Sequence, residues 1–223
     1  MERPIITLPR NLLRPSEFDW DIDWREQSAG VGTGGRRNIL MGVLPRWIGS
    51  PKINLLDRTS LLTWRAHRWA GRGITGVYRL TMWDPVGHRG GGLPSGNPFS
   101  DAVSFSDGTA FENCYQVVTV GYAPAGASEI VIDETGAVAP VRVGQILSHD
   151  DWPFGVTSKM PEGQPGLYRL TVEMPLRRAI DDGALIDLAA TGLFELVDAR
   201  SGNPRYGIDR TSRPSLQLQE WLR

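Results

Sequence analysis

The sequence predicts a mainly β fold, a β-sandwich or barrel of short antiparallel strands with one α-helix, organised as a single domain over residues 1–223. Three observations predict it. Apolar residues fall in short segments separated by clusters of Gly, Pro, Asp and Asn. The 26 glycines and 16 prolines are spread between these segments, as expected of a chain with many turns. Only one segment, at about residues 58–70, spaces its apolar residues as a helix does.

The clearest run of strands lies between residues 141 and 188. Its four short apolar segments, each bounded by turn residues, predict strands at 141–147, 154–160, 167–174 and 184–188. In the third segment apolar and polar residues alternate, apart from Leu167, which predicts one buried and one exposed face. Similar patterns predict further strands at 116–122, 129–132, 191–197 and 214–218.

A strand with one acidic face is predicted near the N-terminus. The apolar residues, expected to be buried, are Phe18, Trp20, Ile22 and Trp24; the acidic ones, expected to be exposed, are Glu17, Asp19, Asp21 and Asp23. A row of carboxylates suggests a metal or sugar site. However, residues two apart on a strand are about 6.5–7 Å apart, so their carboxylates do not converge on one ion. A solvated edge strand, protected from aggregation by its charges, is the favoured interpretation.

The predicted helix at 58–70 combines an apolar stripe with basic residues. Asp57 is expected to cap its N-terminus and Gly71 to follow its C-terminus. The stripe is formed by Leu61, Leu62, Trp64, Ala66 and Trp69, and the basic residues are Arg58, Arg65, His67, Arg68 and Arg72. A subunit interface is favoured over a nucleic-acid contact, because the basic patch is local and arginine is enriched at protein interfaces.

Two glycine-rich segments are predicted as loops. Gly30, Gly32 and Gly35 satisfy the G-x-G-x-x-G spacing, but strand-like residues at 36–41 follow instead of a phosphate-binding helix. A hairpin tip is therefore favoured over a nucleotide site, and an apolar strand is expected at 38–47. Residues 84–107 lack any periodic pattern and predict a long loop, a possible insertion, that runs over the surface or reaches a neighbouring molecule.

Residues 76–81 and 166–171 are nearly the same hexamer, Gly-Val-Tyr-Arg-Leu-Thr and Gly-Leu-Tyr-Arg-Leu-Thr. Two interpretations are open. The segments are either a duplicated strand at equivalent places in paired sheets or a coincidence between two apolar strands, because one short match does not establish a repeat.

Composition excludes several classes of partner. The net charge of −1 gives no overall attraction to nucleic acid or to an anionic membrane, so neither is expected as a partner. No apolar run approaches the roughly 18 residues that span a bilayer, and the N-terminus lacks the features of a signal peptide. The single Cys114 cannot form an intrachain disulfide, which fits a reducing cytoplasm, and it is expected to pack rather than react.

No motif in the sequence indicates catalysis. The cluster His149-Asp150-Asp151 is the only one that joins histidine and carboxylates, and its consecutive spacing before Trp152 is more typical of a solvated turn than of a zinc site. Zinc-binding, P-loop and nucleophile-elbow spacings are missing. We therefore expect a protein that is not an enzyme, with no catalytic residues, no cofactor and no metal.

The order of short motifs near the C-terminus resembles a segment of minor tail proteins from long-tailed bacteriophages. The motifs are Gly144-Gln145-Ile146, Val156-Thr157, Pro175-Leu176-Arg177 and Asp182-Gly183 followed by Ile186. The resemblance implies a tail-tip or distal tail (baseplate) component of the virion, made in the host cytoplasm. It implies a homo-oligomeric ring, a hexamer, that contacts the tail tube protein and the tail hub or fibre proteins.

Other features bear on this expectation. The loop at 84–107 and the acidic first strand depart from the commonest form of the family and leave the position within the tail open. The acidic strand is expected to meet the basic helix of the next subunit. The alternatives are another minor tail component and a carbohydrate-binding β-sandwich module, which the eight tryptophans favour. Most of these tryptophans alternate with charges or lie on the helix stripe, which is the pattern of burial.

Overall fold

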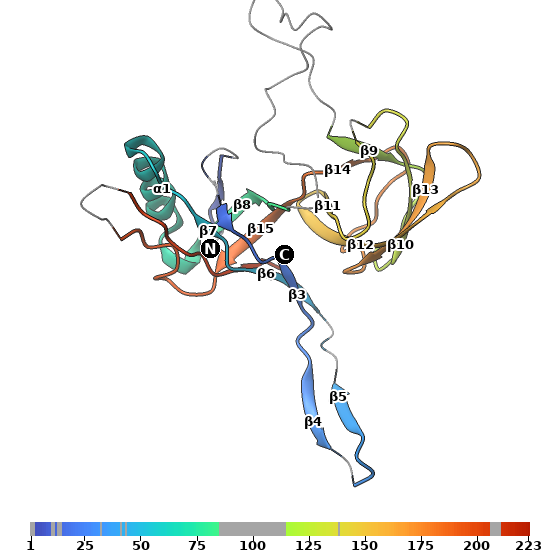
Figure 1. Cartoon of the computed structure of the whole chain (residues 1–223), viewed down its shortest axis with the longest axis horizontal. Coiled ribbons are helices and arrows are strands. Elements are labelled where there is room, and N and C mark those ends of the chain that lie inside the picture. Colours follow the sequence, from blue (N-terminus) through green and yellow to red (C-terminus); the bar gives the residue numbers. More distant parts are fainter. Residues whose placement is uncertain are drawn as a thin grey trace, which may run out of the picture. The chain divides into compact units, whose positions relative to one another are not determined.

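Strands make up most of the regular structure. The computed structural model describes residues 3–9, 12, 15–31, 33–40, 42, 44–84, 115–137, 139–205 and 211–223. Within these ranges the chain is mainly β with one α-helix, so the predicted fold class is confirmed (Figure 1). The chain divides into two units: unit 1 comprises residues 1–79 and 193–223, and unit 2 comprises residues 80–192.

Unit 1 is built on a six-stranded sheet. Across the sheet the strands are β1 (Ile5–Thr7), β8 (Val77–Thr81), β15 (Thr191–Leu196), β16 (Leu218–Glu220), β6 (Arg46–Gly49) and β3 (Asp21–Asp23). β1 pairs in parallel with β8, whereas β16 pairs antiparallel with β15 and β6, and β3 pairs antiparallel with β6. β1 and β3 are therefore the edge strands of this sheet.

The helix forms where the sequence predicts it, as α1 (Arg58–Gly71), and is followed by the 3₁₀ helix η1 (Gly73–Thr75). Asp57 caps the helix by accepting a hydrogen bond of 2.7 Å from the backbone N–H of Ser60, as predicted. The predicted C-terminal end is wrong. Gly71 is the last helical residue, and the left-handed cap is Arg72, with φ 49°. A side chain at Gly71 would collide with the Tyr78 hydroxyl, so the glycine permits close packing there.

One face of α1 contributes to the core of unit 1. Trp64 is 1% exposed, and its Nε1–H donates a hydrogen bond of 2.9 Å to the carbonyl of Gly202. Phe194 on β15 is fully buried, and its ring centroid lies 5.0 Å from that of Trp20. These aromatic contacts join the N-terminal segment and the helix to the C-terminal part of the chain.

Two predicted strands are each divided in the structure. Instead of one strand at 17–24, β2 (Pro15–Glu17) pairs with β7 (Lys52–Ile53) and β3 pairs with β6. The chain thus changes partner strand within the predicted segment. Its four apolar side chains are half-buried rather than buried. The predicted strand at 38–47 becomes β5 (Arg37–Leu40) and β6, which are separated around Gly42, where a side chain would press against Arg25.

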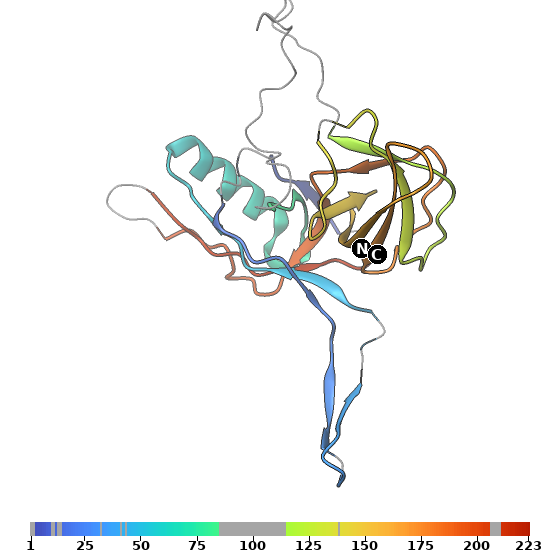
Figure 2. The same cartoon turned by 45° about the vertical axis from the view of Figure 1, so that its right-hand side comes forward.

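Unit 2 contains a closed six-stranded antiparallel barrel (Figure 2). Around the barrel the strands are β9 (Gln116–Thr119), β10 (Glu129–Asp133), β13 (Leu167–Glu173), β12 (Trp152–Pro161), β11 (Ile146–His149) and β14 (Leu185–Asp187). Each predicted strand of this region is present. β11 begins later than predicted because residues 142–145 form a turn. In this turn the Arg142 N–H donates a hydrogen bond of 3.0 Å to the side-chain oxygen of Gln145. The fully buried residues include Ile132, Leu147, Leu170 and Ile186.

Three further expectations differ from the structure or lie outside the described part. The strand predicted at 214–218 begins at Leu218, and Ser212 and Ser215 form isolated bridges instead. The two similar hexamers become β8 in the sheet of unit 1 and β13 in the barrel, so they do not occupy equivalent places in paired sheets. The loop predicted at 84–107 lies outside the described residues beyond Asp84.

Among the described residues, no helix has the length and apolar character needed to cross a membrane.

A surface charge network on the barrel predicts a measurable titration effect. Arg169 donates hydrogen bonds of 2.8 and 2.9 Å to Glu162 and one of 3.1 Å to Glu129. The hydrogen bond from Arg169 lowers the pKa of Glu162 below its ordinary 4.5. The stabilisation from Glu162 is therefore complete above pH 4.5 and is lost as the pH falls through the lower pKa of the folded state.

We expect a carboxyl NMR titration to give a pKa for Glu162 below 4.5, and Arg169→Gln to return it to the ordinary value. Arg178→Gln, which removes another exposed ion pair of the same unit, should leave the pKa of Glu162 unchanged. A Glu162 titration that is the same with and without Arg169 would contradict this assignment.

Candidate assembly interface

The predicted His149-Asp150-Asp151 cluster is a turn between β11 and β12. Asp150 and Asp151 have φ values of 55° and 61°, which suits a two-residue hairpin loop. The three side chains bind separate groups: His149 Nδ1 lies 2.9 Å from the Leu185 carbonyl oxygen, Asp150 pairs with Arg178 at 2.8 Å, and Asp151 accepts a bond of 3.0 Å from Thr191. Among the described residues no group of three or more His, Cys, Asp and Glu is arranged to hold a metal ion.

The carboxylates of the acidic row are also directed to separate partners. Asp19 accepts a hydrogen bond from the backbone N–H of Ser50, and Asp23 accepts one of 2.9 Å from that of Arg25. Asp21 accepts one of 2.8 Å from the adjacent Ile22 N–H, and Glu17 pairs with Lys52. This arrangement does not bring the carboxylates together on one ion. Asp19 and Asp21 remain exposed, while Asp23 is half-buried.

The tryptophans do not form an exposed sugar-binding face. All eight lie in the part of the chain that the structure describes, and only Trp69 is largely exposed, at 69%. Its ring is covered in part by the guanidinium of Arg65, 4.8 Å from the ring centroid. The remaining tryptophans are buried or half-buried. The tryptophan content therefore reflects packing more than a stacking platform.

The basic residues of α1 divide between structural and exposed positions. Arg68 donates hydrogen bonds of 3.0 Å to the side chain of Asn203 and to the carbonyl of Ala199, so it holds the helix to the C-terminal segment. Partial burial lowers the pKa of His67. The outer face presents Leu62 and Trp69 together with arginines, and the helix contains no acidic residue. It is a positively charged face.

An exposed apolar surface of unit 1 lies on a separate two-stranded hairpin, which we call the arm. The arm consists of β4 (Gln27–Val31), β5 and the turn between them, and it includes the glycine-rich segment that predicted a hairpin tip. Figure 1 shows β4 and β5 side by side. Every described residue of these two strands is exposed. Val31, Ile39 and Leu40 are 68%, 53% and 60% exposed, respectively.

The pairing register places two of these apolar side chains on one face of the arm. Val31 lies opposite Arg37, and Ile39 lies two residues after Arg37 on the same strand. Directly paired residues share a face, as do residues two apart, so Val31, Arg37 and Ile39 point to the same side. This face is apolar with one cation and is covered by no described part of the chain.

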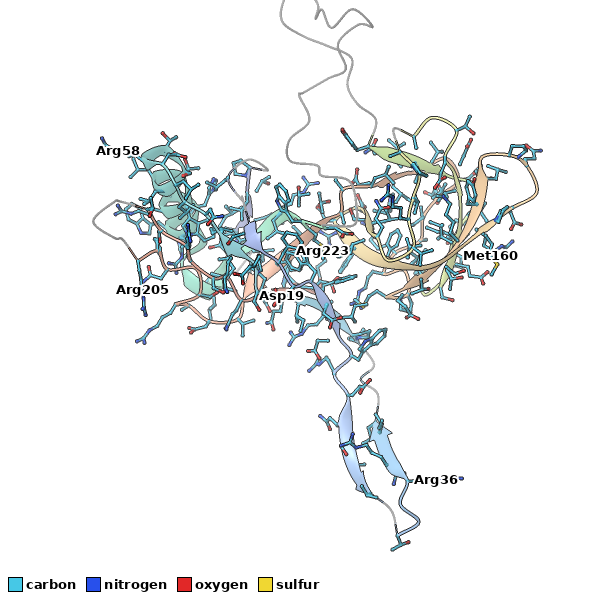
Figure 3. The ribbon with its side chains drawn as sticks, viewed as in Figure 1. Asp19, Arg36, Arg58, Met160, Arg205 and Arg223 are labelled. Carbon is cyan, nitrogen blue, oxygen red and sulfur yellow. The ribbon has the colours of Figure 1, made fainter. Side chains whose placement is uncertain are left out.

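Charge changes sign sharply along this part of the sequence. Residues 17–26 contain five carboxylates and one arginine, whereas residues 27–56 contain no Asp or Glu. Arg36 and Arg37 lie at the turn end of the arm, and Figure 3 labels Arg36 there and Asp19 beside the sheet. The arm is therefore basic, and the segment that leads into it is acidic.

A groove of about 620 Å³ lies at the base of the arm. It is lined by Asp23, Arg25, Glu26, Gln27, Leu40, Gly42, Leu44 and Arg46. Leu44 is 52% exposed, so the groove offers apolar contacts beside two carboxylates and two arginines, of which Arg46 pairs with Asp23. Arg25 at its rim has φ 53°, a conformation that its backbone N–H bond to Asp23 supports.

Sequence reasoning placed the arm as a hairpin but did not identify its side chains as an interface. The sequence feature that could have indicated an interface is the segment 27–56, which has no Asp or Glu but contains arginines and apolar β-branched residues. Comparison with known proteins adds no further assignment. No protein-family model matches the chain, and no curated protein matches its sequence.

Proposed function

We propose that this chain is a structural protein of a phage tail tip. It assembles into a closed homo-oligomeric ring at the distal end of the tail tube and connects the tube to the hub or the fibres. The motif order between residues 144 and 186 supports the placement in a tail. The exposed arm supports the assembly, and it is the observation that carries the proposal.

The arm is expected to be only marginally stable in a chain that stays monomeric. An isolated two-stranded hairpin is marginally stable in water, and its exposed strand edges favour pairing with other chains. In the arm, these edges accompany uncovered Val31 and Ile39 on one face. A second copy of the same chain would bury this face and supply the missing strand partner. A contact between the arm and a different surface of the second copy closes into a ring on repetition when the rotation permits. The expected number of six subunits rests on the resemblance to tail proteins.

Removing the apolar face of the arm is expected to abolish the ring. We predict that the double variant Val31→Ser and Ile39→Ser is monomeric at concentrations at which the unchanged chain forms a ring, because it loses the apolar area buried at the contact. Native mass spectrometry gives the subunit number, and negative-stain images show whether a ring is present.

The matched control replaces two similarly exposed apolar residues of unit 2. Val143 and Met160 are 55% and 62% exposed, and Val143→Ser with Met160→Ser should leave the ring intact. An unchanged chain that remains monomeric would contradict the proposed assembly. Antibodies against the chain should label the tail end of intact particles, and labelling of the head would contradict the placement.

A further inference from the structure

We propose that the arm of one copy binds the acidic base of the arm of a second copy. The acidic base consists of the edge strand β3, the adjacent Glu26 and the groove between Asp23 and Arg46. This inference rests on the proposed homo-oligomer and names the surface that receives the arm.

The first argument is the backbone of the receiving surface. β3 lies at the edge of the six-stranded sheet, and β6 is its one partner among the described strands. Its outer edge therefore presents N–H and C=O groups to an added strand. Both strands of the arm also have an outer edge, because they pair only with each other within the described ranges. Strand addition satisfies both sets of backbone groups.

The second argument is charge. Asp21 on β3 is exposed, and Glu26 is an exposed residue of the groove. Within the described part of the chain, neither carboxylate is held in an ion pair, and the same is true of Arg36 and Arg37. The arm thus carries two uncompensated cations, and its base carries two uncompensated anions.

A second exposed apolar face of unit 1, on α1, does not suit the arm. The outer face of α1 carries Leu62 and Trp69, but its helix contains arginines and no carboxylate. Two basic surfaces repel each other, and like charges that face each other across an interface disfavour the contact. Between the two candidate surfaces, charge therefore favours the acidic base. This differs from the sequence-based expectation that the acidic strand meets the basic helix of the next subunit.

The third argument is the shape of the groove. The groove has a volume of about 620 Å³ and is open to solvent, so a protruding segment of another molecule can enter it. Leu40 and Leu44 provide apolar walls for Val31 and Ile39 of the incoming arm. Glu26 lies beside them for its arginines, whereas Asp23 is already paired with Arg46. Aligned apolar and charged groups give such a contact both affinity and a fixed orientation.

Charge reversal tests the pairing directly. The arm-reversed variant carries Arg36→Glu and Arg37→Glu, and the base-reversed variant carries Asp21→Lys and Glu26→Lys. Each variant alone is expected to self-associate about tenfold or more weakly, measured by sedimentation at low salt. An equimolar mixture should assemble again, because the reversed arm then meets the reversed base and the native arm meets the native base.

The control for the reversal changes the same charge elsewhere. Arg142 and Arg205 are exposed, and Arg142→Glu with Arg205→Glu alters the net charge as the arm reversal does. This control should assemble as the unchanged chain does. Circular dichroism of each variant establishes that it is folded before its association is compared.

A disulfide between copies locates the contact. In a Cys114→Ser background, one copy carries Thr33→Cys in the turn of the arm and the other carries Asp21→Cys. Mixing them under mild oxidation should give a covalent heterodimer, whereas Glu173→Cys on the barrel, also exposed, should not react with the same arm.

The outcomes separate this inference from the proposed function. A ring that forms normally with the reversed arm, or that never cross-links between Thr33→Cys and Asp21→Cys, overturns the inference and leaves the ring standing. A two-fold dimer that shows both effects supports the contact and contradicts the ring. A chain that is monomeric throughout overturns both.

Discussion

Replacing Lys159 by methionine is expected to lower the free energy of unfolding of the barrel by about 3–5 kcal/mol. The Lys159 Nζ lies 2.7 Å from both carboxylate oxygens of Glu134 and 3.0 Å from the Val141 carbonyl, and it is 4.0 Å from the ring centroid of Tyr168. The two charged side chains are only 15% and 8% exposed. The methionine leaves the Glu134 carboxylate largely buried with no cation, and this is the main source of the loss.

Chemical denaturation followed by far-ultraviolet circular dichroism measures this effect. The double variant Lys159→Met and Glu134→Gln should recover much of the loss, because no unpaired charge remains. Arg178→Gln removes an exposed ion pair with side chains 62% and 59% exposed and should cost no more than about 1 kcal/mol. A Lys159→Met variant that unfolds like this surface control would contradict the argument.

Replacing Trp64 by alanine is expected to destabilise unit 1 by about 3–5 kcal/mol. The indole is 1% exposed, and its Nε1–H binds the Gly202 carbonyl at 2.9 Å. Its ring also packs so closely on Gly202 that a Cβ there would lie 2.9 Å from Trp64 Cζ2. The substitution therefore leaves a large cavity, which the closely packed backbone cannot readily fill, and it leaves the Gly202 carbonyl without its hydrogen-bond donor.

Trp69→Ala is the matched control, since it removes the same side chain from the same helix at a position that is 69% exposed. Its effect should lie within about 0.5 kcal/mol. Trp64→Phe should cost less than Trp64→Ala because the ring still fills much of the space, although the hydrogen bond is lost. Equal unfolding midpoints for Trp64→Ala and Trp69→Ala would contradict the predicted core role of Trp64.

The sequence was most informative where structure depends on neighbouring residues. The spacing of the apolar residues and the side chain of Asp57 predicted α1 and its N-terminal cap correctly, because both are local features. Gly71 was wrongly predicted to follow the helix. The glycine is required because the Tyr78 side chain packs against it from β8, a contact that the local sequence does not reveal. Likewise the alternation at 17–24 could not show that the chain changes partner from β7 to β6.

Long-range pairing explains what else was missed. The local patterns predicted the barrel strands, but the closure of β9 onto β14 and β10 depends on residues that are up to about 70 positions apart in sequence. The same limit applies to the arm. An apolar, β-branched pattern indicates that Val31 and Ile39 favour burial, but it does not distinguish burial within the chain from burial against another molecule.

The place of unit 2 in the chain has a consequence for how such genes change. Unit 2 is a single continuous segment that leaves unit 1 from β8 and returns in β15, and these strands are neighbours in one sheet. The Met82 N–H also donates a hydrogen bond of 2.7 Å to the Ala190 carbonyl, so the two ends of the segment lie together. When the two ends of a protein segment lie side by side, recombination can replace the segment by another one, or by a short turn. Such a replacement disturbs the sheet of unit 1 little. Related genes are therefore expected to vary by whole replacement of this segment while they keep the arm and the helix.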